Sequence, residues 1–418
     1  MDRSHRWHRF TAVAAALALA ACSDILSLDV EAPGRIADDD LNTPQAVPGI
    51  VAGMSFDLTD AMDATLQDVL MAGGEIGHGG SYDFGAVPIG TFMTDDEGWD
   101  GEYNSLSQAR WVAEAGLRRI GEVLTPEQFA ESPDVARAYL LAGFANRLMG
   151  ELQCRATFDN GPDVSHMDAF QRADSLFSRA VQIGTSAAKP DIVNAAYGGR
   201  ASVRAWTGRW NEAAVDAARV PTSFVYNAVF SVANQNDFWF ETNTRREFSL
   251  FGTMWVDHPD DPRAPWDIPR DSKDQILRGQ DGQTLFYHQL KYKSAEDDVP
   301  LTHGAEMRLL QAEAALRAGE YAASEGYLND ARARWSMAPL ELPGAAAEAW
   351  AVLRYERYAT LWLEGRRLWD MRRWAVEGAP MADPFLVGRD ACFPIGNEES
   401  RSNPNVTAQW GGCPTCGR

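Results

Sequence analysis

The sequence predicts a mainly α-helical fold, in which tetratricopeptide-like helical hairpins form a right-handed superhelical frame with large irregular, loop-rich insertions. Two observations predict it. Apolar residues recur at helical spacing over several long segments, and a pattern of glycine, aromatic and small residues recurs at two turns between helices. The composition agrees, because 45% of the 418 residues are hydrophobic and 14 are tryptophans, enough for a large packed core.

Helical spacing is clearest after Pro133. Residues 133–153 and 167–184 each place apolar side chains near helical spacing: Val135, Tyr139, Ala142, Leu148 and Leu152 in the first segment, and Phe170, Leu176, Phe177 and Val181 in the second. Because a loop joins the two predicted helices, we expect them to form a hairpin.

The glycine pattern occurs once from Gly208 to Ala213 and again from Gly319 to Ser324. In both copies an aromatic residue follows two positions after the glycine, a small-residue-rich helix precedes it and a second predicted helix follows. This is the tetratricopeptide arrangement, in which small residues let paired helices approach closely. The copies are far apart in sequence, so we do not expect them to be adjacent units of a regular array.

Two stretches interrupt the helical pattern, at about residues 73–105 and 221–302. Both are rich in glycine, proline, aspartate, asparagine and aromatic residues. A helical frame that folds without such insertions does not need them for stability, and long loops in compact domains are usually functional. We therefore expect the binding function in these insertions.

The N-terminus predicts export and lipid anchoring. Arginines precede a short apolar run, and Leu19-Ala20-Ala21-Cys22 matches the bacterial lipobox, in which the cysteine thiol is acylated. Ordinary secretion with an incidental Cys22 is the alternative. We predict a signal peptide over residues 1–21, a lipid anchor and tether over residues 22–45, and a single domain over residues 46–418. Ser23 favours the outer over the inner membrane of a Gram-negative cell.

Four cysteines remain after lipidation, and an even number in an exported chain suggests disulfides. We favour pairing Cys154 with Cys392 and Cys413 with Cys416, because the last two lie in a short CPTC loop. A zinc site lacks further ligands nearby, and a redox site lacks the expected βαβ context.

Residues 354–374 concentrate six arginines, which is typical of a nucleic-acid surface. The net charge of −21 excludes nucleic acid as a partner, because a polyanion meets a repulsive field. On a helix, Glu364 would lie near Arg367, and Asp370 near Arg366 and Arg373. We interpret these arginines as structural, with Gly365 ending a helix or permitting close helix contact.

The same segment resembles the C-terminal signature of the SusD/RagB family, through Glu356-Arg357, Glu364-Gly365-Arg366-Arg367 and Asp370 to Trp374. The helix pair over residues 306–334, the segment Pro394 to Asn405 and the threonine-proline opening at Thr43-Pro44 are similar to further parts of the family pattern. Pro-Ile-Gly replaces the family's Pro-Ile-Pro, and the insertions align with nothing in it.

The resemblance implies a SusD-like fold and a surface-facing outer-membrane lipoprotein. Such a protein captures oligosaccharides, or peptides in the RagB branch, and passes them to a SusC-type TonB-dependent transporter. No cofactor, metal or catalytic residue is expected. One alternative is a helical-repeat scaffold lipoprotein that binds a protein partner. A glycan-active hydrolase is a further alternative, although HExxH, GxSxG and GxxxxGK[ST] are absent from the sequence.

Sugar rings have apolar faces that stack on aromatic side chains, while asparagine, aspartate and arginine bind hydroxyl groups. Both kinds of residue occur in the insertions. The ligand-binding candidates are Tyr82, Phe84, Trp99, Tyr103 and Asn104 in the first insertion, and Trp239, Trp255, Asp257, Trp266 and Tyr287 in the second. We expect the two insertions to converge on one side of the frame.

Overall fold

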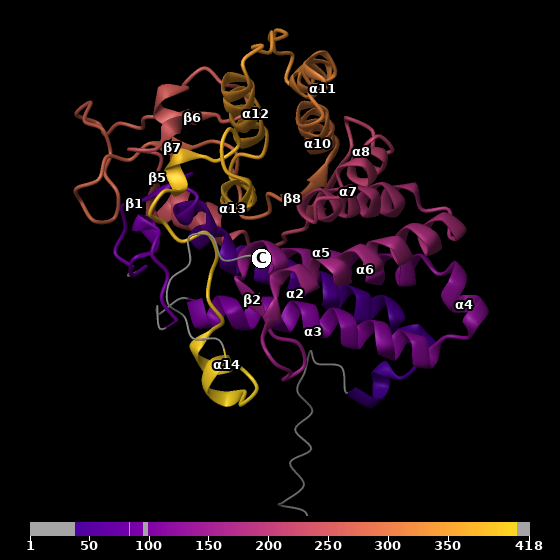
Figure 1. Cartoon of the computed structure of the whole chain (residues 1–418). Helices are drawn as coiled ribbons and strands as arrows, with labels where there is room; N and C mark the ends of the chain where they lie inside the picture. The colour runs from indigo at the N-terminus through magenta and orange to yellow at the C-terminus, as the bar shows by residue number, and fades with distance from the viewer. Residues whose placement is uncertain (1–37, 83, 95–98, 408–418) are drawn as a thin grey trace, which may run out of the picture. The chain divides into compact units, whose positions relative to one another are not determined.

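The computed structural model describes residues 38–82, 84–94 and 99–407, in two units, Met1–Asn42 and Thr43–Arg418 (Figure 1). The described part of the first unit holds one short 3-10 helix, η1 (Asp38–Leu41). The predicted signal peptide, the lipid-anchor residue Cys22, most of the tether, and Cys413 and Cys416 lie outside the described residues. All further description concerns the second unit.

The second unit is mainly helical, as predicted. The first predicted hairpin consists of α5 (Pro133–Leu152) and α6 (His166–Ser186), which pack along each other. Ser132 and Ser165 cap the two helices, because each side chain accepts a hydrogen bond from a backbone N–H of the first turn. The connection between the helices contains a two-stranded pair, β2 (Arg155–Ala156) with β3 (Val164–Ser165).

The two glycine patterns join α7 (Pro190–Trp206) to α8 (Trp210–Ala217), and α10 (Gly304–Arg317) to α11 (Tyr321–Ala333). Gly208 and Gly319 both have φ of +78°, a left-handed conformation that favours glycine at such turns. The expectation that these copies are not adjacent is wrong, because α10 packs against α8. Strand β4 (Val225–Ala228) pairs antiparallel with β8 (Val299–His303), so the second insertion leaves the frame and returns to it at one place.

The remaining helices complete the frame and the C-terminal part. The frame contains α2 (Val47–Ala72), α3 (Trp99–Val123) and α4 (Pro126–Glu131); the C-terminal part contains α12 (Ala346–Thr360), α13 (Arg367–Glu377) and α14 (Asn397–Ser402). Because α3 begins at Trp99, residues 99–105 are helical and the first insertion is shorter than predicted. Asp100 and Glu102 in the first turn of α3 favour a helix start there.

The insertions hold only short elements. They are β1 (Gly77–His78), η3 (Val87–Ile89), α9 (Asp237–Trp239), the π-helix η4 (Phe240–Arg245), β5 (Phe248–Ser249), η5 (Met254–Asp257), β6 (Trp266–Asp267) and β7 (His288–Gln289), with η2 (Pro44–Ala46) and η6 (Pro384–Leu386) near the ends of the unit. Throughout the described ranges, no helix combines the length and the apolar character needed to cross a membrane.

The arginine-rich segment is two helices rather than one. Leu363 and Gly365 have φ of +56° and +69° between α12 and α13, and Gly365 lies close to Leu66 and Val69 of α2. Gly365 therefore both separates the helices and permits a close contact. Of the three predicted side-chain pairs, the structure shows an ion pair only between Asp370 and Arg373, because Glu364 and Arg366 precede α13.

The interpretation of these arginines as structural is confirmed. Arg357 and Arg373 both donate to Asp370, Arg373 also binds Glu313 of α10, and all four side chains are buried. Arg366 pairs with Glu151 of α5 and Glu306 of α10, at 3.1 Å in each case. The cations therefore connect the C-terminal helices to the repeat frame and do not form a binding surface.

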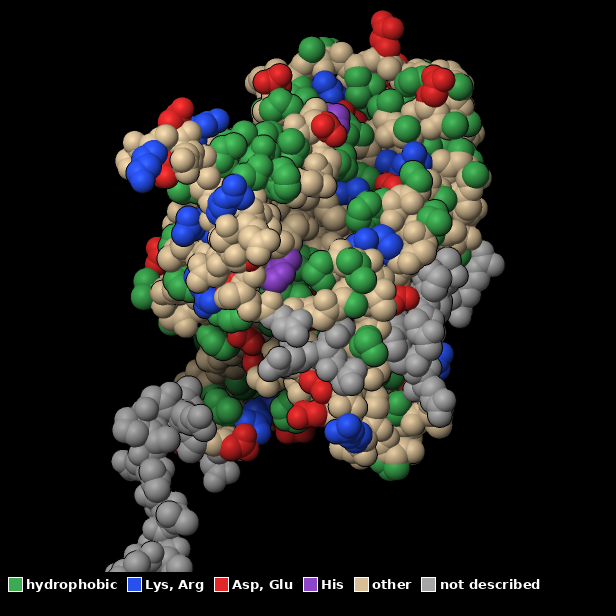
Figure 2. Space-filling model, turned by 90° about the vertical axis from the view of Figure 1, so that its left-hand side faces the viewer, with side chains coloured by type: hydrophobic (Ala, Val, Ile, Leu, Met, Phe, Trp, Pro, Cys, Tyr) green, Lys and Arg blue, Asp and Glu red, His purple; other side chains and the backbone are tan. Residues whose placement is uncertain are grey.

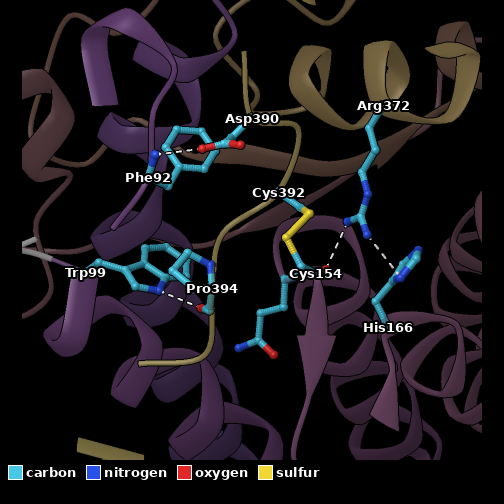
Figure 3. Close-up of a disulfide and its surroundings, with 9 residues drawn as sticks. Phe92, Trp99, Cys154, His166, Arg372, Asp390, Cys392 and Pro394 are labelled. Carbon is cyan, nitrogen blue, oxygen red and sulfur yellow. Dashed lines mark hydrogen bonds between the residues drawn. A yellow bond between two sulfur atoms is a disulfide. The ribbon is translucent and has the colours of Figure 1, made fainter. Parts of the chain in front are cut away.

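The disulfide between Cys154 and Cys392 is confirmed (Figure 3). It links the end of α5 to the C-terminal segment across 238 positions of sequence. Beside it, the backbone N–H of Cys154 donates to the carbonyl of Phe393 at 2.9 Å. The C-terminal segment is thus attached to the frame covalently and by hydrogen bonds.

Candidate functional site

The two insertions meet, as expected. Strand β1 of the first insertion pairs antiparallel with β5 of the second, in the register Gly77 with Ser249 and His78 with Phe248. Beyond this pair the Gly79 N–H donates to the Glu247 carbonyl at 2.8 Å, and the Asp281 N–H donates to the Gly79 carbonyl at 2.9 Å. Loops far apart in sequence therefore form one surface (Figure 1).

Five aromatic side chains on this surface are exposed or half-buried, and we call them the insertion site: Tyr82, Phe84, Phe251, Trp266 and Tyr287. The side of the molecule that carries the insertions is seen in Figure 2, where hydrophobic side chains gather in one group in the upper half of the view. Phe251 was not among the predicted residues. Its position beside predicted aromatics in the same loop was the only signal for it.

Trp266 and Tyr287 form a stacked pair within the insertion site. Their rings stack with an interplanar angle of 6° and centroids 5.5 Å apart, because β6 pairs with β7 and brings the two strands together. Phe251 packs its edge against Tyr287 at 5.4 Å and is itself 44% exposed. Trp266 Nε1 donates to the carbonyl of Trp255 at 3.1 Å, which fixes the orientation of its indole.

Polar side chains occupy the other face of these strands, because successive strand side chains point to opposite faces. Asp267 and His288 directly follow Trp266 and Tyr287 in the paired strands, and His288 Nδ1 lies 3.3 Å from Asp267 Oδ1. The Asp267 side chain is half-exposed, so its oxygens can accept hydrogen bonds from a ligand.

The second part of the insertion site is centred on Tyr82, whose side chain is 44% exposed. The Arg245 guanidinium lies 4.2 Å from the Tyr82 ring centroid, a cation–π arrangement. Arg245 also pairs with the buried Glu247 at 3.2 Å and with Glu241 at 3.3 Å. Burial raises the pKa of Glu241, although Arg245 acts in the opposite direction.

Three predicted ligand-binding residues are instead core residues: Trp99, Tyr103 and Trp255 are 2%, 1% and 0% exposed. Trp99 stacks on Phe393 at 4.2 Å and donates to the carbonyl of Pro394 (Figure 3). These side chains offer no face to a ligand, because their large apolar surfaces contribute to stability by being buried. Their presence in loop-rich sequence did not distinguish them from exposed aromatics.

The remaining predicted residues lie apart from the stacked pair. Asn104, exposed on α3, donates to Glu398 of α14 at 3.0 Å. Trp239 is half-buried on α9 against the core. Asp257 is exposed and lines a separate cleft of about 340 Å³ together with His258 and Tyr355. Within residues 38–82, 84–94 and 99–407 no group of three or more histidine, cysteine, aspartate or glutamate side chains is arranged to hold a metal ion.

Sequence comparison identifies the SusD family over residues 288–410, which include the whole arginine-rich signature. No curated protein is significantly similar to the chain in sequence.

Solved structures share the fold. A SusD/RagB family protein from Bacteroides thetaiotaomicron is 13% identical with a TM-score of 0.64, covering 84% of this chain and 94% of its own. A SusD superfamily protein from Bacteroides fragilis is 14% identical with a TM-score of 0.67, covering 89% and 99%. A SusD-like carbohydrate binding protein from Bacteroides vulgatus is 13% identical with a TM-score of 0.61, covering 79% and 83%.

The helical frame with its loop-rich insertions is the fold of SusD-like structures and not that of a regular helical-repeat array. Residues 288–410 match the SusD family and solved SusD-family structures share the fold, in agreement with the resemblance found in the sequence.

Proposed function

We propose that the protein is a lipid-anchored, surface-facing protein of the outer membrane. It captures oligosaccharides, or peptides, and delivers them to a SusC-type TonB-dependent transporter without catalysing a reaction. The match of residues 288–410 to the SusD family supports this proposal, and one structure of the same fold is described as a carbohydrate binding protein.

The observation that carries the proposal is the stacked pair of Trp266 and Tyr287 at the junction of the two insertions. Both rings are only half-buried, so each leaves apolar surface on which the C–H face of a sugar can pack. Asp267 follows Trp266 in the same strand, and its half-exposed carboxylate can accept hydrogen bonds from hydroxyl groups. A rigid aromatic platform with polar neighbours suits a ring-shaped, hydroxyl-rich ligand better than an extended peptide.

Binding calorimetry with a panel of neutral glycans and short peptides tests the proposal. Trp266→Ala and Tyr287→Ala should each weaken glycan binding by about 1–3 kcal/mol, the scale for losing an apolar platform. Trp266→Phe should retain part of the affinity because it keeps a ring. Phe56→Ala is the matched control, since Phe56 is 50% exposed on α2.

Two results would contradict the proposal. If Trp266→Ala and Phe56→Ala bind every glycan equally well, the insertion site does not bind the glycan. If product analysis of the same mixtures finds cleaved ligand, the protein is an enzyme and not a capture protein. Peptide binding that requires Trp266, without glycan binding, would assign the ligand to the peptide class.

A further inference from the structure

A second hollow lies on the frame, away from the insertion site, and shares no residue with it. This α3 cleft has a volume of about 810 Å³, within the range of small-molecule sites. Its walls come from α3, the turn between β2 and β3, and α14, which Figure 1 shows below the frame. The lining residues are Ser107, Gln108, Arg110, Trp111, Val112, Arg118, Thr157, Asp159, Asn160 and Glu399.

Helical spacing produces the first wall. Ser107, Trp111 and Arg118 are four and seven positions apart along α3, so they lie along one side of the helix. Trp111 is 52% exposed, which is unusual for so large an apolar side chain. It places one exposed indole between polar groups.

The opposite wall is held in place by the rest of the chain. The Tyr103 hydroxyl is 2.7 Å from the Thr157 hydroxyl, and Asn405 Nδ2 donates to the Asn160 carbonyl at 2.9 Å. Asp159 and Asn160 have φ of +52° and +60°, a conformation tolerated better by these residues than by most. The wall is therefore pre-formed, which lowers the entropy that binding must offset.

Arginines stabilise the ionised carboxylate in this wall. Arg110 Nη1 donates to Asp159 at 2.8 Å, and this hydrogen bond, with the charges of Arg110, Arg172 and Arg118, lowers the pKa of Asp159. Arg118 is exposed and also lines the cleft, and Glu399 adds a second carboxylate. Charges of both signs lie beside the amides of Gln108 and Asn160, which both donate and accept.

From these observations we propose that the α3 cleft is a second glycan-binding site, which takes a neutral oligosaccharide segment. An exposed indole supplies the apolar platform, and cations, carboxylates and amides around it supply donors and acceptors for hydroxyl groups. Because the charges are mixed rather than of one sign, a neutral, hydroxyl-rich ligand fits the cleft better than an anionic one. Two sites on one protein would raise the avidity for a long glycan.

Fluorine NMR of the full-length chain, labelled with fluorinated tryptophan, tests this site separately from the insertion site. Trp111→Phe and Trp266→Phe identify the two resonances, which report on the two sites. Maltohexaose, cellohexaose and xylohexaose are titrated singly to millimolar concentration. We expect at least one of them to shift the Trp111 resonance saturably, whether or not the Trp266 resonance moves.

Arg118→Ala should raise the Kd obtained from the Trp111 resonance by about fivefold. This is the scale of one lost hydrogen bond. Arg179→Ala is the matched control, because Arg179 is exposed on α6 and does not line the cleft. Trigalacturonate should bind more weakly than the neutral probes, because Asp159 and Glu399 repel its carboxylates.

Three outcomes would overturn the proposal. The first is that no neutral probe shifts the Trp111 resonance, and the second is that the Kd is the same in Arg118→Ala as in the wild type. The third is that trigalacturonate binds more tightly than every neutral probe. A silent Trp111 with a responsive Trp266 rejects the α3 cleft and retains the proposed function. If the Trp111 resonance shifts and the Trp266 resonance does not, the α3 cleft is retained as a glycan site and the insertion site is rejected.

Discussion

Individual carboxylates hold the buried arginines of this protein, and Asp370 is the clearest case. Its side chain is 1% exposed and accepts from Arg357 Nε at 2.7 Å and from Arg373 Nε at 2.9 Å. Arg373 also binds Glu313, whereas Asp370 is the only carboxylate shown within ion-pair distance of Arg357 in the described chain. Loss of the Asp370 charge would therefore leave a buried cation without a counter-ion.

Asp370→Asn should lower the free energy of unfolding by about 3–5 kcal/mol, because breaking a buried ion pair leaves one charge desolvated and unpaired. Urea unfolding monitored by circular dichroism measures this loss. Glycan affinity per folded molecule should not change. Asp274→Asn is the control, since that side chain is 88% exposed. A loss no larger than that of the control would show that the network contributes little.

Glu75 should make stability depend on pH. Burial raises its pKa to about 7, even though the Leu363 N–H donates to it at 2.8 Å. The folded state therefore binds a proton more tightly than the unfolded state, whose carboxyl titrates near 4.5. The contribution of Glu75 to stability is fully present below the unfolded pKa, falls as pH rises through the folded pKa, and is constant above it.

Glu75→Gln removes this titration and retains a side-chain oxygen that can accept from Leu363. The unfolding free energy of the wild type minus that of Glu75→Gln should fall between pH of about 4.5 and about 7. Denaturant unfolding across that range measures the difference. Glu122→Gln, at an exposed position, controls for the loss of a carboxylate. A difference that rises with pH over this interval would contradict the sign.

The burial of individual tryptophans in the insertions was not predictable from the sequence. Trp266 and Trp255 are both tryptophans in the same insertion, and one is half-buried while the other is fully buried. Neither lies in a periodic segment, so no helical or strand pattern assigned it an inner or outer face. Their burial depends on contacts with distant segments, such as the packing of Trp255 against Trp362 at 5.8 Å.

At the scale of elements, the positions of helices along the chain were predicted more reliably than the contacts between helices. The spacing of apolar residues placed α5 and α6 to within a few residues, because that pattern is local. The contact of α8 with α10 was not predicted, because it depends on the pairing of β4 with β8 across the whole second insertion. Likewise, the sequence left open whether a helix ends at Gly365, and left-handed Leu363 and Gly365 separate α12 from α13 there.

The bridge between the end of α5 and the C-terminal segment gives a prediction at this scale. Removing the disulfide in Cys154→Ser/Cys392→Ser should lower the free energy of unfolding by about 2–5 kcal/mol, because the unfolded chain loses a cross-link over a long loop. The fold should persist, since the Phe393 N–H still donates to the Leu152 carbonyl at 2.8 Å.

Guanidinium unfolding of the wild type and the double variant, each with and without a reductant, measures this effect. The reductant should destabilise the wild type and leave the variant nearly unchanged. Equal destabilisation of both proteins by the reductant would assign the effect to cysteines other than this pair.

At the scale of the whole molecule, convergence of the insertions was expected from the idea that both serve one function, and the pairing of β1 with β5 confirms it. Which aromatics form the resulting surface was not predictable. Both insertions contain exposed and buried rings, and only the three-dimensional contacts distinguish them. The α3 cleft was missed for a similar reason, because its walls come from three elements distant in sequence.

Attachment of the whole molecule to the membrane is predicted to depend on Cys22, which lies outside the described residues. We propose acylation of Cys22 as the attachment, because Leu19-Ala20-Ala21-Cys22 matches the bacterial lipobox. Cys22→Ala should move the protein from the membrane fraction to the soluble fraction and abolish its labelling by palmitate, because stable anchoring requires more than one acyl chain.

Ser23→Ala is the matched control and should remain anchored and labelled. A transporter could also retain unlipidated protein at the membrane, so labelling is the decisive measurement. Palmitate incorporated into the Cys22→Ala variant would show that another residue carries the lipid.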